Sequence, residues 1–565
     1  MRFVLVFTAA IALVTASLGV AAPQRSASWT GEELSYVVLY DLGASTAAAR
    51  SAVKAAGGTI VKENLKVGVA TVVSQNPSFV EAVGSQNALT GAALDRPIGH
   101  TVGTPSGADL ELVKARAAAK GTIRDTRDFE AKGGAEPLAD LQWGMAMMHA
   151  TVDGSYARER GKHVLVGIMD TGVDGNHPDI APNFSRKLSR NFTTDIPLVD
   201  GPCADEPDRS CSDAADTDEN SHGTHVASII GSPINGLGVA GVAPEVTLVN
   251  IRAGQDSGYF FLQATVDAFT YAGDIGIDVV NMSFFTDPWL YNCPSDPTAS
   301  PAEQAQQRTI IEATQRAVDY AHRRGVILVA ASGNEDQDLG DATKTDGISP
   351  DFPPGTERDR VVDNTCIDVP TESNHVLSIN SVGPTTRKAD YSNYGLEQST
   401  VAAPGGWFRD DPWTAANPIA GLPNLILAAY PENVAREFGE INPDGTPNTP
   451  FVLRDCRGST CGYYQYLQGT SMASPHAVGV LALIVGAHKQ QKKLSPDDAQ
   501  RILEETATDH ACPTPALHSY ADKGRPPSFT ALCEGTPQFN GFYGHGIADA
   551  LRAIQGSQDD GKNKD

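Results

Sequence analysis

Short apolar runs alternate with helical segments over residues 136–555, and this alternation constrains the fold more than any other feature. The runs are apolar at consecutive positions, so we expect both faces of each strand to be covered. Such strands, separated by helices, predict an α/β domain whose parallel sheet is flanked by helices. The strand candidates are HVLVGIM, VTLVNIR, DVVNMSF, GVILVAAS and HVLSINSVG, and the helix candidates include LQATVDAFTYAGD and QQRTIIEATQRAVDYAHRRG.

Residues 28–103 follow another pattern and predict a separate small domain. A strand-like SYVVLYDLG precedes an Ala-rich helical stretch, and the alternating TIVKENLKVGVATVVS precedes a second helical stretch, NPSFVEAVGSQ. The order β-α-β-β-α predicts a small α+β, ferredoxin-like domain. Residues 104–135, rich in Ala, Lys, Arg and Gly, predict a linker, and the polar residues 556–565 predict a disordered tail.

The chain begins with the features of a secretory signal peptide. Arg2 supplies a positive start, Phe3 to Val14 is apolar, and small residues follow, which predicts cleavage after Ala21 and a signal peptide of residues 1–21. The alternative is a membrane anchor, since Phe3 to Ala22 has just the length to span a bilayer. We expect secretion and no membrane association after cleavage. The net charge of -25 excludes nucleic acid and anionic lipid as partners.

The cysteine count is even, which in a secreted chain indicates disulfides. Eight cysteines allow 105 pairings, so only proximity in the sequence guides the prediction. Close neighbours suggest the pairs Cys203–Cys211, Cys456–Cys461 and Cys512–Cys533, which leave Cys293 with Cys366.

The stretch YLQGTSMASPHAVGVLAL, residues 466–483, predicts a helix that is buried on all sides, because it has almost no polar face. Ser471 lies near its first turn, where backbone N–H groups have no partner inside the helix. A serine at this place is either a helix cap or a nucleophile beside free N–H donors. Asp170, which follows HVLVGIM, could be only a turn former. His222 in NSHGTHVAS could be a structural histidine. A zinc site from His222 and His225 is a further alternative, but no ligand cluster in the sequence supports it.

Together the stretches DTGVDGNHPD, NSHGTHVAS and GTSMASPH resemble the three active-site signatures of the subtilisin-like serine peptidases, in that family's order Asp, His, Ser. The resemblance covers roughly residues 142–550 and includes the closing segment GFYGHGIADALRAI. It implies a subtilisin-like fold and a serine endopeptidase. Ser471 would be the nucleophile, His222 its general base and Asp170 the group that orients the imidazole. Asn334, in VILVAASGNED, matches the family's oxyanion asparagine.

The resemblance also implies where substrate binds. NMSFFTDP matches one substrate-binding strand of the family, with Ser283 followed by Phe284 and Phe285 where many relatives have leucine and glycines. These rings would either narrow a subsite or pack inward. The opposite wall would be formed by Ala331, Ser332 and Gly333. Extra residues at 287–308, 335–374 and 405–465 predict disulfide-pinned surface loops at the rim of the cleft.

Two further features follow from the resemblance. Residues 28–103 are similar to the inhibitor-like propeptides of the family, which implies a zymogen that cleaves itself between Gly121 and Gln142; an accessory binding domain is the alternative. HVASIIGSPINGLGVAGVAP matches the family's calcium loop in length, with Asp179 and Asn235 at ligand positions and carbonyls from Pro233, Leu237 and Val239. The acidic residues 205–219 are interpreted as a solvated loop.

We therefore expect a secreted, monomeric serine endopeptidase that acts on proteins or peptides. Its own propeptide would inhibit it, the chemistry would require no cofactor, and calcium would have a structural role. Two alternatives stay open at this point: a non-enzymatic binding protein of the same fold, and a transpeptidase that uses the same acyl-enzyme.

Overall fold

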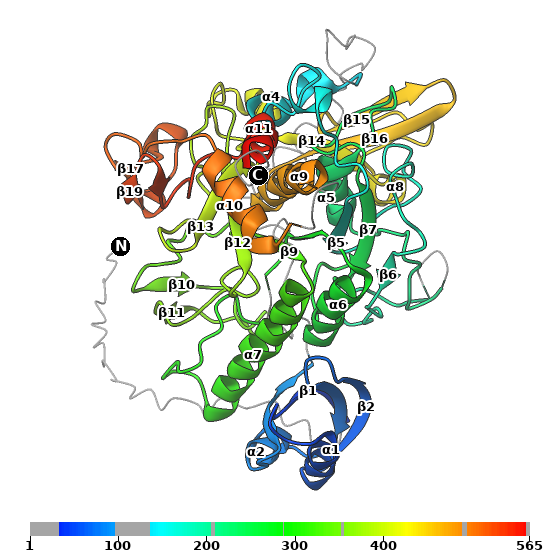
Figure 1. The fold of residues 1–565 in the computed structure, drawn as a ribbon, viewed down its shortest axis with the longest axis vertical. Helices are drawn as coiled ribbons and strands as arrows, with labels where there is room; N and C mark the ends of the chain where they lie inside the picture. Colours follow the sequence, from blue (N-terminus) through cyan, green and yellow to red (C-terminus); the bar gives the residue numbers. More distant parts are fainter. Residues whose placement is uncertain are drawn as a thin grey trace, which may run out of the picture.

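The computed structural model describes residues 33–95, 136–204, 209–285, 288–351, 355–488 and 494–560. The predicted signal peptide and the linker 104–135 lie outside these ranges. The described residues form two sheets of the predicted kinds, a large parallel one and a small antiparallel one (Figure 1).

The large sheet has seven strands in the order β13-β12-β9-β8-β5-β7-β6, and every pair in it is parallel. All five apolar runs predicted as strands belong to it, as β5, β7, β8, β9 and β12, which confirms the fold class. Its strands are β5 (Leu165–Met169), β6 (Arg190–Asn191), β7 (Thr247–Arg252), β8 (Val279–Met282), β9 (Ile327–Ala331), β12 (Val376–Val382) and β13 (Ser399–Pro404).

Helices cover both faces of this sheet, because successive strand residues point to opposite faces and both sets are apolar. In β9, for example, Ile327 and Val329 pack with α5, α9, α10 and α11, whereas Leu328 and Ala330 pack with α6 and α7. The helices of the first face are α5 (His222–Gly231), α9 (Thr470–His488), α10 (Pro496–Thr506) and α11 (Ala550–Asp560); those of the second are α6 (Leu262–Ile275) and α7 (Pro301–Arg323). The short α4 (Trp143–Met147) lies among the elements of the first face (Figure 1).

The predicted burial of the helix that carries Ser471 is confirmed. α9 starts at Thr470, and its residues are buried from Thr470 to Val485. Among the described residues it is also the one helix with the length and apolar composition of a membrane span, and 89% of that apolar window lies inside the protein. The closing helix α11 runs to Asp560, so it extends into the segment predicted as a disordered tail.

The small N-terminal domain is an antiparallel sheet in the order β2-β3-β1-β4, with two helices on one side. Its elements are β1 (Leu34–Tyr40), α1 (Thr46–Ala55), β2 (Gly58–Asn64), β3 (Val69–Ser74), α2 (Phe79–Gly84) and β4 (Leu89–Leu94). The first five match the predicted order. The sixth, β4, has the sequence LTGAAL, whose small residues gave no strand pattern.

The free face of this small sheet rests on α6 and α7 (Figure 1). Val37, Leu39 and Val69 of the small sheet belong to the same apolar cluster as residues of α6 and α7. Polar contacts surround this cluster: Lys62 Nζ lies 2.7 Å from Asp267 Oδ2, and Asn64 Nδ2 donates to Asp267 Oδ1 at 2.9 Å.

The segments predicted as surface loops contain more regular structure than expected. Residues 405–465 contribute most of an antiparallel sheet in the order β14-β16-β15, with a buried cluster that includes Phe408, Trp413, Phe451 and Tyr464. The added elements are β10 (Lys344–Asp346), β11 (Arg360–Val362), β14 (Ile426–Tyr430), α8 (Glu432–Glu437), β15 (Val452–Arg457) and β16 (Thr460–Leu467). Four short strands complete the fold: β17 (Leu517–His518), β18 (Ala531–Leu532), β19 (Gly535–Thr536) and β20 (Phe539–Asn540).

All four disulfides have the predicted partners. Cys456–Cys461 closes the hairpin of β15 and β16, and Cys293–Cys366 joins the segments 287–308 and 335–374. Cys203–Cys211 and Cys512–Cys533 close shorter loops.

Candidate active site

Three of the predicted site residues follow the ends of neighbouring strands in the large sheet. Asp170 follows β5, Ser283 follows β8, and Asn334 comes three residues after β9. The three strands are adjacent and parallel, so their carboxyl ends meet at one edge of the sheet. In open α/β sheets this edge is where ligands bind.

His222 is the first residue of α5, and it faces Asp170. Its Nδ1 lies 2.8 Å from Asp170 Oδ1, and both side chains are buried. Asp170 Oδ1 also accepts a hydrogen bond from the Thr171 N–H at 2.8 Å, which fixes the carboxylate. The other ring nitrogen, Nε2, is buried without a hydrogen-bond partner among the described residues. With Nδ1 bonded to the carboxylate, Nε2 is the nitrogen left to accept a proton.

Asp218 holds the turn that presents His222, and the sequence analysis did not identify it. Its Oδ1 accepts from the N–H groups of Asn220 and Ser221, and its Oδ2 accepts from the N–H and the hydroxyl of Thr224. Ser221 adopts a left-handed φ of 91°, which these bonds stabilise. No capping pattern in the sequence marks Asp218, because the N-cap position of α5 is Ser221 and Asp218 lies three residues before it.

Ser471 is the second residue of α9 and is fully buried. Ser283 ties it to the sheet: Ser283 Oγ donates to the Ser471 carbonyl at 3.0 Å, and Ser471 Oγ lies 3.5 Å from the Ser283 carbonyl oxygen. Asn281 Nδ2 in turn donates to Ser283 Oγ at 2.8 Å. The Ser471 N–H belongs to the first turn of α9.

Asn334 lies against the same turn. Its Oδ1 accepts from both the N–H and the hydroxyl of Thr470, each at 3.0 Å. Because the amide oxygen is used in this way, the Nδ2 group is the end available to donate to another oxygen. The Asn334 amide and the first turn of α9 are therefore placed together, as a pair of donors for one oxyanion requires.

The residues predicted to form one wall of the substrate cleft lie beside these groups. Ala331, Ser332 and Gly333 continue from β9, and the Gly333 N–H donates to Thr470 Oγ1 at 3.2 Å. Gly333 has a φ of 99°, and a Cβ there would lie 2.3 Å from Asn393 Nδ2, so the position admits no side chain.

Phe284 and Phe285 both pack inward, which decides between the two alternatives for these rings. Phe284 stacks on Phe260 with centroids 4.0 Å apart and an angle of 11° between the planes. Phe285 is 4% exposed and packs with Tyr291 and the Cys293–Cys366 disulfide. Neither ring is positioned to narrow a subsite.

A half-buried carboxyl group, that of Glu335, follows Asn334 directly in the chain. Burial raises the pKa of Glu335 to about 7, although a hydrogen bond from Asn393 Nδ2 at 2.6 Å favours its charged form.

The predicted calcium residues also meet, and a third carboxylate joins them. Asn235 Nδ2 donates to Asp179 Oδ1 at 3.0 Å, and Glu136 Oε1 accepts from the Gly236 N–H at 3.0 Å. Glu136 Oε2 and Asn235 Oδ1 are buried without a hydrogen-bond partner among the described residues. Burial raises the pKa of Asp179 well above its usual range and raises the pKa of Glu136. Orphaned oxygen donors beside two buried carboxyl groups fit a hard cation such as calcium.

One expectation for the neighbourhood of His222 needs correction, and the zinc alternative finds no support there either. The acidic segment is not simply a solvated loop: Asp213 is buried and forms an ion pair with the fully buried Arg252, and Asp218 is buried as well. His225 does not share a metal position with His222, because its Nε2 lies 3.0 Å from the Gln465 carbonyl oxygen on β16.

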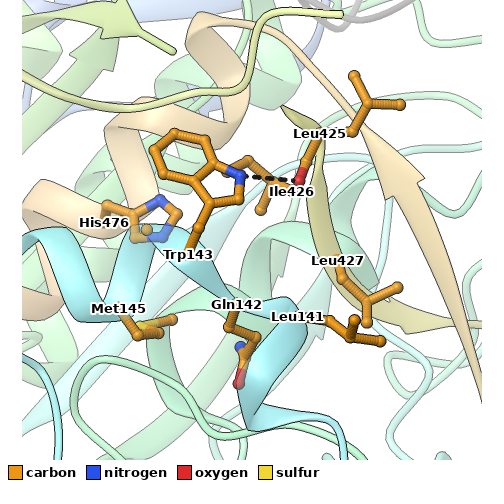
Figure 2. Close-up of a pocket in the computed structure, with 9 residues that line it drawn as sticks. Leu141, Gln142, Trp143, Met145, Leu425, Ile426, Leu427 and His476 are labelled. Atoms are coloured by element: carbon orange, nitrogen blue, oxygen red, sulfur yellow. Dashed lines mark hydrogen bonds between the residues drawn. The ribbon is translucent and has the colours of Figure 1, made fainter. Parts of the chain in front are cut away.

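A small cavity lies between α4, the start of β14 and His476 of α9. Figure 2 shows Trp143 and His476 at this cavity, with the indole N–H donating to the Leu425 carbonyl at 3.1 Å. Its lining contains none of Asp170, His222, Ser471 and Asn334, so it is not the site described above.

The subtilase family model matches residues 161–546. Subtilisin DY of Bacillus licheniformis is 28% identical over 349 residues, which cover 62% of this chain and 85% of that protein. The major intracellular serine protease of Bacillus subtilis (strain 168) is 28% identical over 342 residues, which cover 60% and 74%. Among solved structures, the epidermin leader peptide processing serine protease from Staphylococcus aureus has a TM-score of 0.61 at 22% identity and covers 93% of this chain and 98% of that one.

Proposed function

Since this chain belongs to the subtilase family and is a subtilisin-like serine protease, we propose that it is a secreted, monomeric endopeptidase that acts through an acyl-enzyme and cleaves its own precursor. The observation that carries the mechanism is the 2.8 Å contact between His222 Nδ1 and Asp170 Oδ1. This contact lies at the edge of the sheet, and Ser471 lies in the first turn of α9. Its substrates are proteins or peptides, as the family implies.

In this mechanism His222 Nε2 takes the proton of Ser471 Oγ as the oxygen attacks the carbonyl carbon of the peptide bond. Asp170 stabilises the imidazolium through Nδ1, and the proton is then passed to the leaving amine. The oxyanion receives hydrogen bonds from the Ser471 N–H and the Asn334 amide. Water then hydrolyses the acyl-enzyme by the reverse sequence of proton transfers, with His222 again acting as the base.

Two measurements test this proposal together. A fluorophosphonate should attach covalently to Ser471, and a diverse peptide mixture incubated with the mature protein should give new amino and carboxyl termini by mass spectrometry. A folded protein that neither takes up the reagent nor cuts any peptide would instead be a binding protein of the same fold. Products joined to added amines in place of hydrolysed products would indicate a transpeptidase.

The zymogen proposal rests on the contact between the N-terminal domain and α6 and α7. Asn64 Nδ2 donates to both Asp267 Oδ1 and Thr270 Oγ1, at 2.9 and 2.8 Å, in a buried part of the contact. We propose that this domain remains bound after the first cut and inhibits the protease until it is released.

Asn64→Ala should therefore shorten the lag before the processed complex becomes active on dilution. Removing a buried hydrogen-bonding partner costs about 1–3 kcal/mol, which corresponds to an affinity loss of about 5- to 150-fold. Lys54→Ala on the exposed side of α1 is the matched control and should leave the lag unchanged. An unchanged lag in Asn64→Ala would mean that this contact does not control release.

We also propose that calcium binds among Glu136, Asp179 and Asn235, with carbonyls of Pro233, Leu237 and Val239 completing the shell. The support is the set of buried, unbonded oxygens at Glu136 and Asn235. Calcium would balance the negative charge of two carboxyl groups whose pKa values burial raises.

The calcium proposal predicts a characteristic pH dependence of stability. Without calcium, the raised pKa values of Asp179 and Glu136 mean that the folded protein holds protons that the unfolded chain has released above about pH 4. Their contribution to stability is therefore lost as pH rises toward 7, and calcium should remove that loss. The measurement is the melting temperature at pH 5 and pH 7 with calcium or with chelator, in a Ser471→Ala background that prevents self-digestion. An identical calcium effect in Asp179→Ala would reject the site.

Secretion is proposed from the four disulfides, which form and persist in oxidising compartments.

A further inference from the structure

Three potential metal ligands converge far from the residues of the proposed mechanism. His322 lies in the last turn of α7, His375 directly precedes β12, and Asp497 is the second residue of α10. His322 Nε2 is 3.0 Å from Asp497 Oδ1, and one ligand atom from each of the three residues lies within 4.8 Å of the others. The two imidazole rings are stacked, with centroids 3.9 Å apart and planes at 12°.

The backbone holds His375 in this position. It adopts a left-handed φ of 69°, and its neighbour Asn374 is fastened to α7. The Asn374 N–H donates to Gln315 Oε1 at 2.9 Å, and Gln315 Nε2 donates back to the Asn374 carbonyl at 3.3 Å. Gln315 and His322 lie two turns apart on α7, so the same helix fixes both histidines.

Asp497 is held with similar firmness at the start of α10. Ser495 caps this helix by accepting from the Asp498 N–H at 3.1 Å, so the backbone of its first turn is ordered. The Asp497 side chain itself is 77% exposed, which leaves the group open to an ion from solvent. Figure 1 shows α10 close to the end of α7, in agreement with the contact of the two side chains.

We propose that His322, His375 and Asp497 bind a zinc ion that joins the end of α7 to the start of α10. Two imidazoles and a carboxylate are ligands that zinc prefers, and a tetrahedral ion with ligand bonds of about 2.0–2.2 Å holds its ligand atoms about 3.3–3.6 Å apart. His322 Nε2 and Asp497 Oδ1, 3.0 Å apart, need to separate by only a few tenths of an ångström to reach this spacing, and a rotation of the exposed His375 side chain would bring in the third ligand. Zinc would replace the proton that His322 and Asp497 share, and a water molecule would take the fourth position.

The zinc ion would act on stability and not on catalysis. His375 stands at the amino end of β12, whereas Asp170, Ser283 and Asn334 stand at the carboxyl ends of their strands. Because the site joins two helices on opposite faces of the sheet, binding should resist their separation on unfolding. The plain alternative is a surface ion pair of His322 and Asp497, which contributes little and does not depend on a metal.

The test uses the full chain with Ser471→Ala, stripped of metals and saturated with calcium, and titrated with zinc or cobalt. One equivalent should bind, and cobalt should develop the intense visible absorption of a tetrahedral site. At zinc about one hundred times above the dissociation constant, the ratio of folded to unfolded protein should rise about one hundredfold. In the enzyme that retains Ser471, peptide cleavage should be the same with and without the substitutions His375→Ala and Asp497→Asn.

His375→Ala and Asp497→Asn should each abolish the one-equivalent binding and the rise in melting temperature. His545→Ala is the matched control, since His545 pairs with one carboxylate, Glu504, at 3.9 Å and belongs to no metal-ligand cluster among the described residues. If His375→Ala does not fold, Asp497→Asn decides alone, because it keeps the shape of the side chain. Absence of saturable binding, or binding that persists in Asp497→Asn, would overturn the zinc site.

Discussion

Replacing Ser471 by alanine is expected to lower turnover by about 10⁶-fold, the size of the loss on removing the nucleophile of a subtilisin. The side chain is small and buried, and its hydrogen bond to the Ser283 carbonyl is long at 3.5 Å, so the fold should survive. The same variant should accumulate as a precursor that still carries the N-terminal domain, because the first cut would be made by the chain on itself. An intramolecular cut does not depend on enzyme concentration.

Mass spectrometry of Ser471→Ala, expressed in a host without extracellular proteases, measures both effects. Ser474→Ala is the matched control, since it removes a buried hydroxyl one turn further along α9 that donates to Asn281 Oδ1 at 2.8 Å. It should lose stability yet mature normally. If Ser471→Ala is processed at the same bond as the wild type, another protease makes the cut and self-processing is wrong.

Asn334→Ala is expected to lower kcat by about 10²–10³-fold and to leave KM nearly unchanged, which is the effect known for the oxyanion asparagine of subtilisin. The reason is that its Nδ2 would donate to an oxygen that is negatively charged only in the transition state. Steady-state kinetics on a peptide that the mature enzyme cuts well would measure the loss. A higher KM at constant kcat would instead assign Asn334 to substrate binding.

Asn334→Ala also removes the acceptor for Thr470, so a second variant is needed. Asn334→Asp keeps an oxygen for the Thr470 N–H and hydroxyl but replaces the donor by another oxygen. Its kcat should fall at least as far as that of Asn334→Ala. Recovery of activity in Asn334→Asp would show that Asn334 acts through Thr470 alone.

The sequence predicted the large sheet well, because strands buried on both faces appear as continuous apolar runs. It missed β13, whose sequence is STVAAP, and β4, whose sequence is LTGAAL, because small residues resemble turns and loops as much as strands. Residues 405–465 were predicted as a loop, although YYQYL in β16 pairs with β14 and β15 of the same segment.

The residues that carry the mechanism were identified through their motifs, while their supports were not. Asp218 and Arg252 act through partners that are distant or unremarkable in the sequence, and Glu136 meets Gly236 from 100 residues away. The orientation of Phe284 and Phe285 likewise depended on packing partners, Phe260 and Tyr291, that only the folded chain identifies.

The position of Glu136 at the proposed calcium site limits where a mature chain could begin. The Glu136 carboxylate accepts from the Gly236 N–H, and two residues later the Leu138 N–H donates to the Gly238 carbonyl at 2.8 Å. The chain is therefore anchored from the first described residue of the large domain. A cut after Glu136 would discard one of the buried carboxylates and leave a frayed end beside the loop. A cut before Glu136 leaves a terminus that is anchored by its contacts with Gly236 and Gly238. Proteases cleave an anchored terminus less readily than a free one. We therefore expect the proposed self-cleavage between residues 121 and 142 to occur at a bond on the amino side of Glu136. The new amino terminus of the mature enzyme would then resist further cleavage by the same active site.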